Sequence, residues 1–272
     1  MSAQASHCSH YQPPLQDIRF VQQHWLGAEG DWRRMPAHEA LDQETADMVV
    51  EAAGRFCADV LAPLNGPADL QGCRLEQGRV RTPDGFPAAY AAFVEAGWPA
   101  LACAPDAGGQ GLPQLLDAAL HEMLASANHG WTMYPGILHG AYACLHAHGD
   151  EHLRATYLPH IVSGRWLATM CLTEPQAGSD LGLLRSQARP RGDGSYSLDG
   201  SKIFISGGDQ DMSENIVHLV LARLPDAPEG TRGLSLFLAP RGIPRDDGSF
   251  LPNAIHCDGI EKKMGIKGSA TC

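Results

Sequence analysis

The sequence predicts an α+β fold in which a helical half comes first and a half made of short β-strands follows. Up to about residue 165, apolar residues recur at helical spacing, as Val49, Ala53, Phe56 and Val60 do. Beyond that point, apolar and polar residues alternate, and turns rich in Gly and Asp separate short apolar runs. This order favours a helical domain followed by a small β-barrel or sandwich.

In the helical half, five main helices are expected. The first covers residues 41–64 and is expected to end at Pro63, and the others cover 86–98, 113–128, 131–148 and 150–162. A further short helix is expected at residues 15–26. The stretch 97–112 is rich in Gly and Pro and is predicted to be a loop, and long ordered loops between helices are often functional.

In the β half, residues 194–206 predict a hairpin that turns at Asp199-Gly200, a favoured two-residue turn. Further strands are expected at 216–224 and 233–239, with one or two short ones in 253–268. These elements predict three parts: an N-terminal extension at 1–37, a helical domain at 38–165 and a β domain at 166–272.

The chain is acidic, with 20 Lys and Arg against 31 Asp and Glu, a formal charge of −11. This balance argues against binding to nucleic acid or anionic lipid, which needs a basic face. No run of about 18 apolar residues predicts a membrane span, and no secretory signal is recognised at the N-terminus. A cytoplasmic protein with eight reduced cysteines is therefore expected.

Two groups of histidines raise the question of a metal site: "HCSH" at residues 7–10, and a second group at His139, His146, His148 and His152. Because no carboxylate lies at convincing spacing, packing or surface histidines are favoured and no metal is predicted. The glycines of residues 108–111 favour a tight turn, since neither a P-loop nor a dinucleotide-binding fingerprint surrounds them.

The stretch "MCLTEPQAGSDLG", residues 170–182, is the strongest candidate for a ligand site. Its apolar start ends at Leu172, and the hydroxyls of Thr173 and Ser179 follow. On composition alone, a strand that ends in a capped turn is slightly favoured over a ligand site. A second segment, residues 204–208, repeats the design with the aromatic Phe204 and the hydroxyl of Ser206. If both face one cleft, they suit a flat ligand with polar edges.

These two segments, in this order, resemble the acyl-CoA dehydrogenase family. "MCLTEPQAGSD" is similar to the first signature motif of the family, and "KIFISGG" to the segment that flanks the flavin. The resemblance covers nearly the whole chain. It is closest to the large subgroup that includes 3-methylmercaptopropionyl-CoA dehydrogenases, on the strength of "YQPPLQDIRFV" and "IEKKMGIKGSATC".

The resemblance implies FAD as cofactor and an acyl-CoA as substrate, which is oxidised to a trans-2-enoyl-CoA. A hydride from the β-carbon would pass to the flavin while a carboxylate base removes an α-proton. The loop at 97–112 and residues 131–140 would shape the acyl pocket.

The resemblance assigns cofactor-binding roles to seven residues: Met170, Leu172, Thr173, Ser179, Phe204, Ile205 and Ser206. In the family, residues at the first two positions pack on the isoalloxazine ring, and the hydroxyl at the third bonds its pyrimidine edge. Ser206 stands where a Thr near flavin N5 is common, and Phe204 where shorter-chain members often carry Trp. Ser179 matches a position that also binds the CoA substrate.

The family has a third domain, a C-terminal helical bundle that usually holds the catalytic glutamate. Because this chain stops at Cys272, it is expected to be a fragment, and no residue in it is assigned as the base. When complete, the protein is expected to be a homo-oligomer that passes electrons to an electron-transfer flavoprotein. Three alternatives on the same scaffold stay open: a non-enzymatic flavin or acyl-CoA binder, a nucleic-acid-associated protein, and a flavin monooxygenase.

Overall fold

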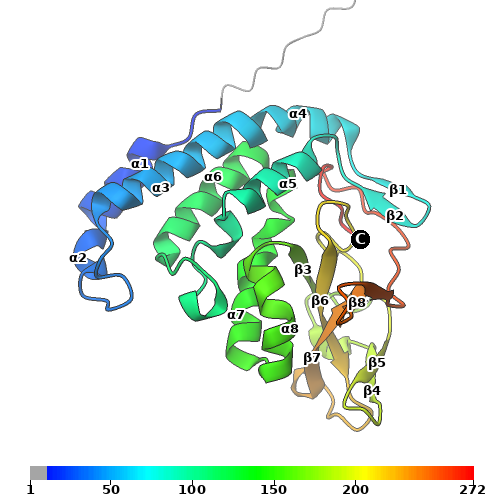
Figure 1. Cartoon of the computed structure of the whole chain (residues 1–272). Helices are drawn as coiled ribbons and strands as arrows, with labels where there is room; N and C mark the ends of the chain where they lie inside the picture. The colour runs from blue at the N-terminus through cyan, green and yellow to red at the C-terminus, as the bar shows by residue number, and fades with distance from the viewer. Residues whose placement is uncertain (1–10) are drawn as a thin grey trace, which may run out of the picture.

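The computed structural model describes residues 11–272, and a helical half precedes a β half in it, which confirms the predicted fold class (Figure 1). The helices are α1 (Leu15–Arg19), α2 (Ala28–Trp32), α3 (Gln43–Phe56), α4 (Ala62–Gln71), α5 (Phe86–Glu95), α6 (Gln114–Thr132), α7 (Leu138–His148) and α8 (Glu151–Val162). The strands are β1 (Arg74–Glu76), β2 (Arg79–Arg81), β3 (Trp166–Cys171), β4 (Gln187–Pro190), β5 (Tyr196–Asp199), β6 (Asn215–Arg223), β7 (Leu234–Pro240), β8 (Gly242–Pro244) and β9 (Phe250–Pro252). No helix within residues 11–272 combines the length and apolarity needed to cross a membrane.

The predicted end of the first long helix at Pro63 is wrong. At its C-terminus α3 passes into a π-helical segment, Cys57–Leu61, and α4 then continues to Gln71. Pro63 therefore lies in the first turn of α4, where a missing N–H breaks no intrahelical bond. The helix predicted at 113–128 also extends further, because α6 continues to Thr132 across a kink at Asn128.

The predicted hairpin turn at Asp199-Gly200 is also wrong. Instead, β5 pairs with β4 in the antiparallel sense, and residues 191–195 make the turn, closed by the Arg191 amide on the Ser195 carbonyl. Glycine is required at position 200 because the backbone there packs closely against Ser186. A Cβ at this position would lie 2.2 Å from the hydroxyl oxygen of Ser186. Residues 200–204 leave the sheet without forming a strand.

The main sheet is mixed and has five strands, in the order β3-β6-β4-β5, with β7 paired to β6. β3 and β6 run parallel, so that Thr169 is opposite His218 and Met170 is opposite Leu219. The strands predicted at 216–224 and 233–239 are confirmed as β6 and β7. Those predicted within 253–268 are absent from the structure, which forms only an isolated bridge further on, between Ser206 and Thr271.

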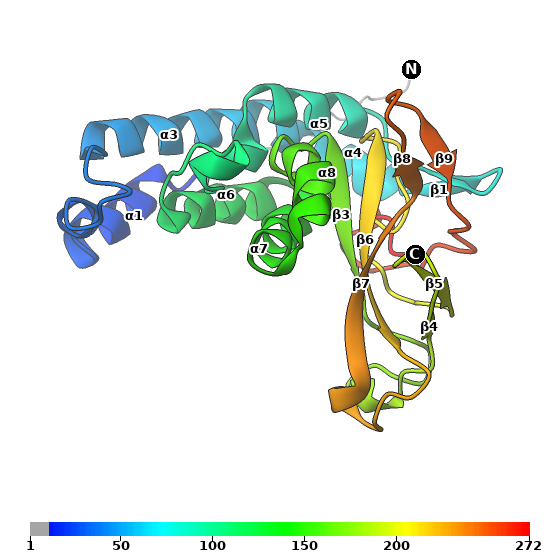
Figure 2. The ribbon, with the colours of Figure 1, turned by 60° about the horizontal axis from the view of Figure 1, so that its bottom comes forward.

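One apolar core joins the two halves. Trp166 and Ala168 of β3 and Leu219 of β6 are buried in the same cluster as the helices, and the His160 ring of α8 stacks on Trp166 at 3.9 Å. Figure 2 shows the helices as a layer beside the upper part of β3 and β6, while β7 extends away from it. The division at residues 37 and 165 stays a prediction.

Candidate functional site

The structure brings the two sequence segments of the predicted site together. Met170 lies near the end of β3, and Leu172 and Thr173 follow directly. The amide of Ile203 donates to the Thr173 carbonyl at 3.0 Å, which places the segment before Phe204 against the end of β3. Because strand pairing does not continue here, this contact sets the local register of the two segments.

The predicted residues differ in exposure in a way that suits a flat ligand. Met170, Leu172 and Thr173 are half-buried, and so is Ser206. The Phe204 ring is 49% exposed, and the Lys263 ammonium nitrogen lies 5.0 Å from its centroid. Ile205 is buried, so its side chain is part of the packing beneath this surface.

The backbone at Phe204 is in a left-handed conformation, with φ at 63°. Such a conformation is unusual for an aromatic residue and is typical of functional sites when the surroundings hold it in place. Here the neighbours do so, since Ile203 bonds Thr173 and Ile205 exchanges two hydrogen bonds with Cys272. The result is an aromatic ring held outward at the edge of the site.

Among the hydrogen bonds of residues 11–272, none joins Ser179 to the other predicted residues. Ser179 is exposed and follows a tight turn in which Glu174 and Ala177 exchange two backbone hydrogen bonds. The Asp180 carboxylate accepts from the Gly182 amide at 2.9 Å and caps a short 3-10 helix. The capped-turn interpretation of this stretch is therefore correct for Asp180, and the role of Ser179 stays a prediction.

Glu174 proves to be a buried anchor beside the site. Its carboxylate accepts from the amide and the hydroxyl of Ser186 at 3.0 and 2.5 Å, from the Arg185 amide at 2.8 Å and from the Lys202 ammonium at 2.9 Å. Burial raises the pKa of this carboxyl, but the hydrogen bonds outweigh it and hold the pKa at about 2.

Sequence reasoning missed a polar group beneath the sheet. The Nδ1 of His218 lies 2.7 Å from the Thr169 hydroxyl, and its Nε2 is buried without a partner in the described chain. Burial, reinforced by the charge of Arg241, lowers the pKa of His218 to about 4, so the ring is neutral near pH 7. The only available signal was a histidine inside the apolar run of residues 216–221.

The C-terminal segment completes the far side of the site. Thr271 forms a bridge with Ser206, and its buried hydroxyl has no hydrogen-bond partner in residues 11–272. Tyr134 holds this segment, because its hydroxyl accepts from the Ala270 amide at 2.8 Å and donates to the Gly268 carbonyl at 3.1 Å. An unsatisfied hydroxyl and an outward aromatic ring leave polar and apolar groups available to a bound ligand.

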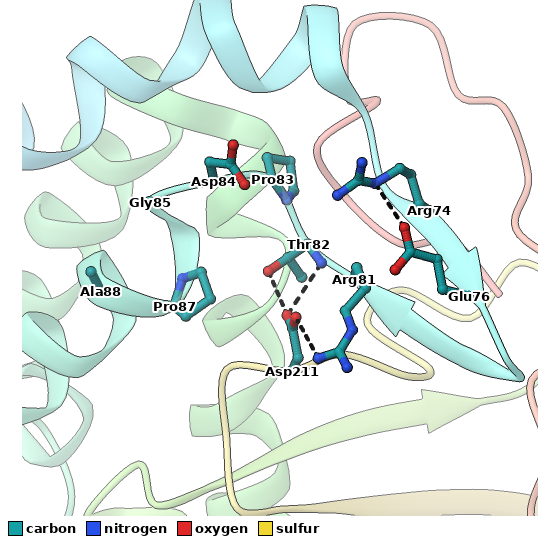
Figure 3. A pocket seen from close by; sticks show the side chains of 10 residues that line it. All are labelled: Arg74, Glu76, Arg81, Thr82, Pro83, Asp84, Gly85, Pro87, Ala88 and Asp211. Atoms are coloured by element: carbon teal, nitrogen blue, oxygen red, sulfur yellow. Dashed lines mark hydrogen bonds and ion pairs between the residues drawn. The ribbon is translucent and has the colours of Figure 1, made fainter.

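Two open pockets contain none of the seven residues predicted to bind the cofactor. One, of about 500 Å³, lies between the β1–β2 hairpin and the start of α5, and Figure 3 shows Arg81 turned toward Asp211 and Arg74 toward Glu76. Both arginines of its lining are already paired with acids, Arg81 with Asp211 and Arg74 with Glu76. The other, of about 520 Å³, is lined by residues of the Glu174–Gln176 loop, β4 and the end of β5.

The structure places the second histidine group on and beside α7. His139 lies 2.9 Å from the Gln114 amide nitrogen, and the His146 ring stacks on Tyr142. Within residues 11–272, no three potential ligands lie close enough to hold a metal ion. "HCSH" lies outside the described residues.

The predicted loop at 97–112 is compact and is anchored to α7. Two short 3-10 turns shape it, and the Ala104 amide donates to the Tyr142 hydroxyl at 2.8 Å. Gly109 is required by a close approach, because a Cβ there would lie 2.0 Å from the Cys103 carbonyl oxygen. The tight turn predicted for residues 108–111 is confirmed in this form.

Comparison with known proteins matches both halves of the chain. The family model for the acyl-CoA dehydrogenase N-terminal domain matches residues 43–165, and that for the middle domain matches residues 169–272. A 3-methylmercaptopropionyl-CoA dehydrogenase of Ruegeria pomeroyi is 43% identical over 265 residues, which cover 96% of this chain and 44% of that protein.

A butyryl-CoA dehydrogenase of Syntrophomonas wolfei is 35% identical over 266 residues, covering 94% of this chain and 43% of that protein. Among solved structures, an acyl-CoA dehydrogenase of Bacillus anthracis complexed with FAD has a TM-score of 0.64 at 23% identity, over 86% of this chain and 35% of that one. This chain spans less than half the length of these relatives.

Proposed function

This chain belongs to the acyl-CoA dehydrogenase family, and from that premise we propose that it binds FAD and serves the α,β-dehydrogenation of an acyl-CoA. The observation that supports this most is the hydrogen bond between Ile203 and Thr173, which aligns the two segments that resemble the family's flavin wall. The product would be a trans-2-enoyl-CoA.

The residues present fit a flavin. Met170 and Leu172 offer half-buried apolar surface for a flat ring, and the ring of Phe204 stands exposed beside them. The hydroxyls of Thr173 and Ser206 can donate to the polar edge of a heterocycle. Bound FAD would supply the hydride acceptor.

The role of this chain's residues would be orientation and exclusion of water. The left-handed backbone at Phe204 holds the ring outward before any ligand arrives, so this segment would lose little conformational freedom when the ligand binds. Below it, buried Ile205 and the apolar end of β3 keep water from the side of the site nearest the core.

We assign no catalytic base within this chain. Glu174 is the carboxylate nearest the site in sequence, but it is buried and accepts hydrogen bonds from five groups around it. Its pKa of about 2 lies far below that of an effective base near neutral pH. The base, the homo-oligomer and an electron-transfer flavoprotein as acceptor are proposed from family membership alone.

The test is reduction of bound flavin by substrate. The protein would be expressed with any coding sequence that continues beyond Cys272, and its flavin absorbance near about 450 nm recorded. A panel of acyl-CoAs would include butyryl-CoA and 3-methylmercaptopropionyl-CoA, the substrates in the relatives' names. Bleaching by one of them is expected. A yellow protein that no acyl-CoA bleaches would contradict the dehydrogenase assignment.

A further inference from the structure

Lys202 stands just before the second segment of the proposed flavin site, and its side chain reaches the first segment. Its ammonium donates to the Leu172 carbonyl at 3.0 Å and to the Glu174 carboxylate at 2.9 Å. These partners stand on either side of Thr173. The Lys202 side chain is only 10% exposed and the Glu174 side chain 4%, so solvent does little to weaken the contacts.

The residue next to Lys202 completes a three-point attachment. Ile203 donates its amide to the carbonyl of Thr173 itself at 3.0 Å. Residues 202 and 203 therefore bond the backbone carbonyls of Leu172 and Thr173 and the side chain of Glu174. Ser206 follows a few residues later in the same segment, so the distance between the two proposed flavin-binding hydroxyls depends on this attachment.

Glu174, the acidic partner of Lys202, is itself held in place by further hydrogen bonds. Besides Lys202, its carboxylate accepts from Ser186 and the Arg185 amide, just before β4, and from the Gln176 side-chain amide at 2.6 Å. A buried ammonium without a counter-charge would be strongly unfavourable, and this carboxylate compensates it. Because Glu174 cannot move without losing these bonds, Lys202 cannot move either.

We propose that Lys202 is a positioning residue of the flavin site, which sets Thr173 and Ser206 at the separation that lets both hydroxyls bond one isoalloxazine ring. The inference rests on the proposed function, since it presupposes FAD at this surface. Lys202 acts through Thr173 and does not itself contact the flavin.

A double-mutant cycle on FAD affinity separates this role from a general effect on stability. Lys202→Met and Thr173→Val are each expected to raise the Kd for FAD about tenfold. If Lys202 acts through Thr173, the double variant loses little more than either single variant, whereas independent effects would give a loss of about a hundredfold. The absorption band of the bound flavin should shift in the same way in both single variants.

The matched control is Arg33→Met. Arg33 pairs with Glu29 at 2.6 Å, but its side chain is 65% exposed and it directly follows α2, which contains none of the residues proposed to bind flavin. The Kd of this variant for FAD should equal that of the wild type. If Lys202→Met does not yield folded protein, Lys202→Gln replaces it in the same cycle, with a smaller expected rise in Kd because its amide can still donate to the Leu172 carbonyl.

The outcomes distinguish the two proposals. Additive effects, or an unchanged Kd in Lys202→Met, would overturn the positioning role and leave the flavin site intact. A wild-type protein that binds no FAD, expressed with any coding sequence beyond Cys272, would overturn both.

Discussion

His218 is the residue whose burial has the clearest consequence for pH. Its pKa is lowered from 6.5 to about 4, chiefly by burial. Because the unfolded chain takes up this proton at a higher pH than the folded chain, the stability that neutral His218 contributes is fully present above pH 6.5. It is lost as the pH falls from 6.5 toward 4, to a maximum of about 3 kcal/mol.

The check is urea unfolding at about pH 7.5 and about pH 5. Between these values the wild type should lose about 2 kcal/mol more than His218→Gln, in which the titrating ring is gone. Since the other titrating groups are common to both proteins, they cancel in the comparison. Equal losses would mean that the His218 ring is not held neutral.

Glu174 offers a second test at this scale. Glu174→Gln should lower the free energy of unfolding by about 3–5 kcal/mol, because the Lys202 ammonium is left buried without a counter-charge. Glu214→Gln is the matched control, since its pair with Arg165 is half exposed and should be worth less than about 1 kcal/mol. Similar losses in urea unfolding of the two variants would contradict the buried anchor.

The residues in and around the site differ in whether they could be identified from the sequence alone. Thr173, Phe204 and Ser206 could be proposed from the sequence because each stands in a short motif that resembles the family's, and their contacts with flavin stay a prediction. The Lys202 anchor was not predictable, because its partners lie 28 and 30 residues away in the chain. His218 was hidden for a similar reason, since its partner Thr169 lies on another strand.

At the scale of elements, the kink of α6 depends on Asn128. This buried residue has non-helical angles, and its side-chain oxygen accepts from the Trp131 amide at 3.0 Å. Its side-chain nitrogen donates to the Leu61 carbonyl at 3.2 Å, at the end of the π-helical segment. The side-chain amide of Asn128 thus caps the part of α6 that follows the kink. It also donates a hydrogen bond to the last carbonyl of the π-helical segment.

Asn128→Ala should therefore lower the free energy of unfolding by about 2–3 kcal/mol, from the lost cap and an unpaired buried carbonyl. Asn128→Ser should recover part of this loss, because Ser keeps a capping oxygen while it cannot reach Leu61. Chemical denaturation of the wild type, Asn128→Ala and Asn128→Ser measures these differences in the free energy of unfolding. A Ser variant as unstable as the Ala variant would show that capping contributes nothing here.

Two predictions about elements were wrong for similar physical reasons. Pro63 was expected to end a helix, but the π-helical turn before it starts a new first turn in which proline is tolerated. The Asp199-Gly200 pair has the composition of a hairpin turn, but Gly200 is needed for the approach of Ser186. In both cases the structure depends on a residue or turn outside the short sequence pattern on which the prediction was based.

At the scale of the whole molecule, Tyr134 joins the helical half to the C-terminal segment. Its buried hydroxyl bonds the Ala270 amide and the Gly268 carbonyl. Tyr134→Phe leaves the Ala270 amide without this acceptor, which should lower the free energy of unfolding by about 1–3 kcal/mol. Tyr157→Phe is the control, because no protein group in residues 11–272 bonds its hydroxyl. Equal midpoints in urea for the two variants would exclude this junction as a source of stability.

The overall order of a helical half and a β half was predictable from the change in hydrophobic period near residue 165. The packing of the halves was not, because it depends on which face of β3 and β6 meets the helices. The stacked pair of Trp166 and His160 belongs to two elements whose contact no periodicity predicts.

The central claim is that FAD lies across the ends of the segments that contain Thr173 and Ser206. Amide hydrogen exchange of the protein, expressed with any coding sequence beyond Cys272, tests this most directly when measured with and without FAD. Added FAD should slow exchange at residues 170–174 and 203–207, and leave the β1–β2 hairpin unchanged. Protection confined to the hairpin and the start of α5, or absent from both segments, would contradict the account.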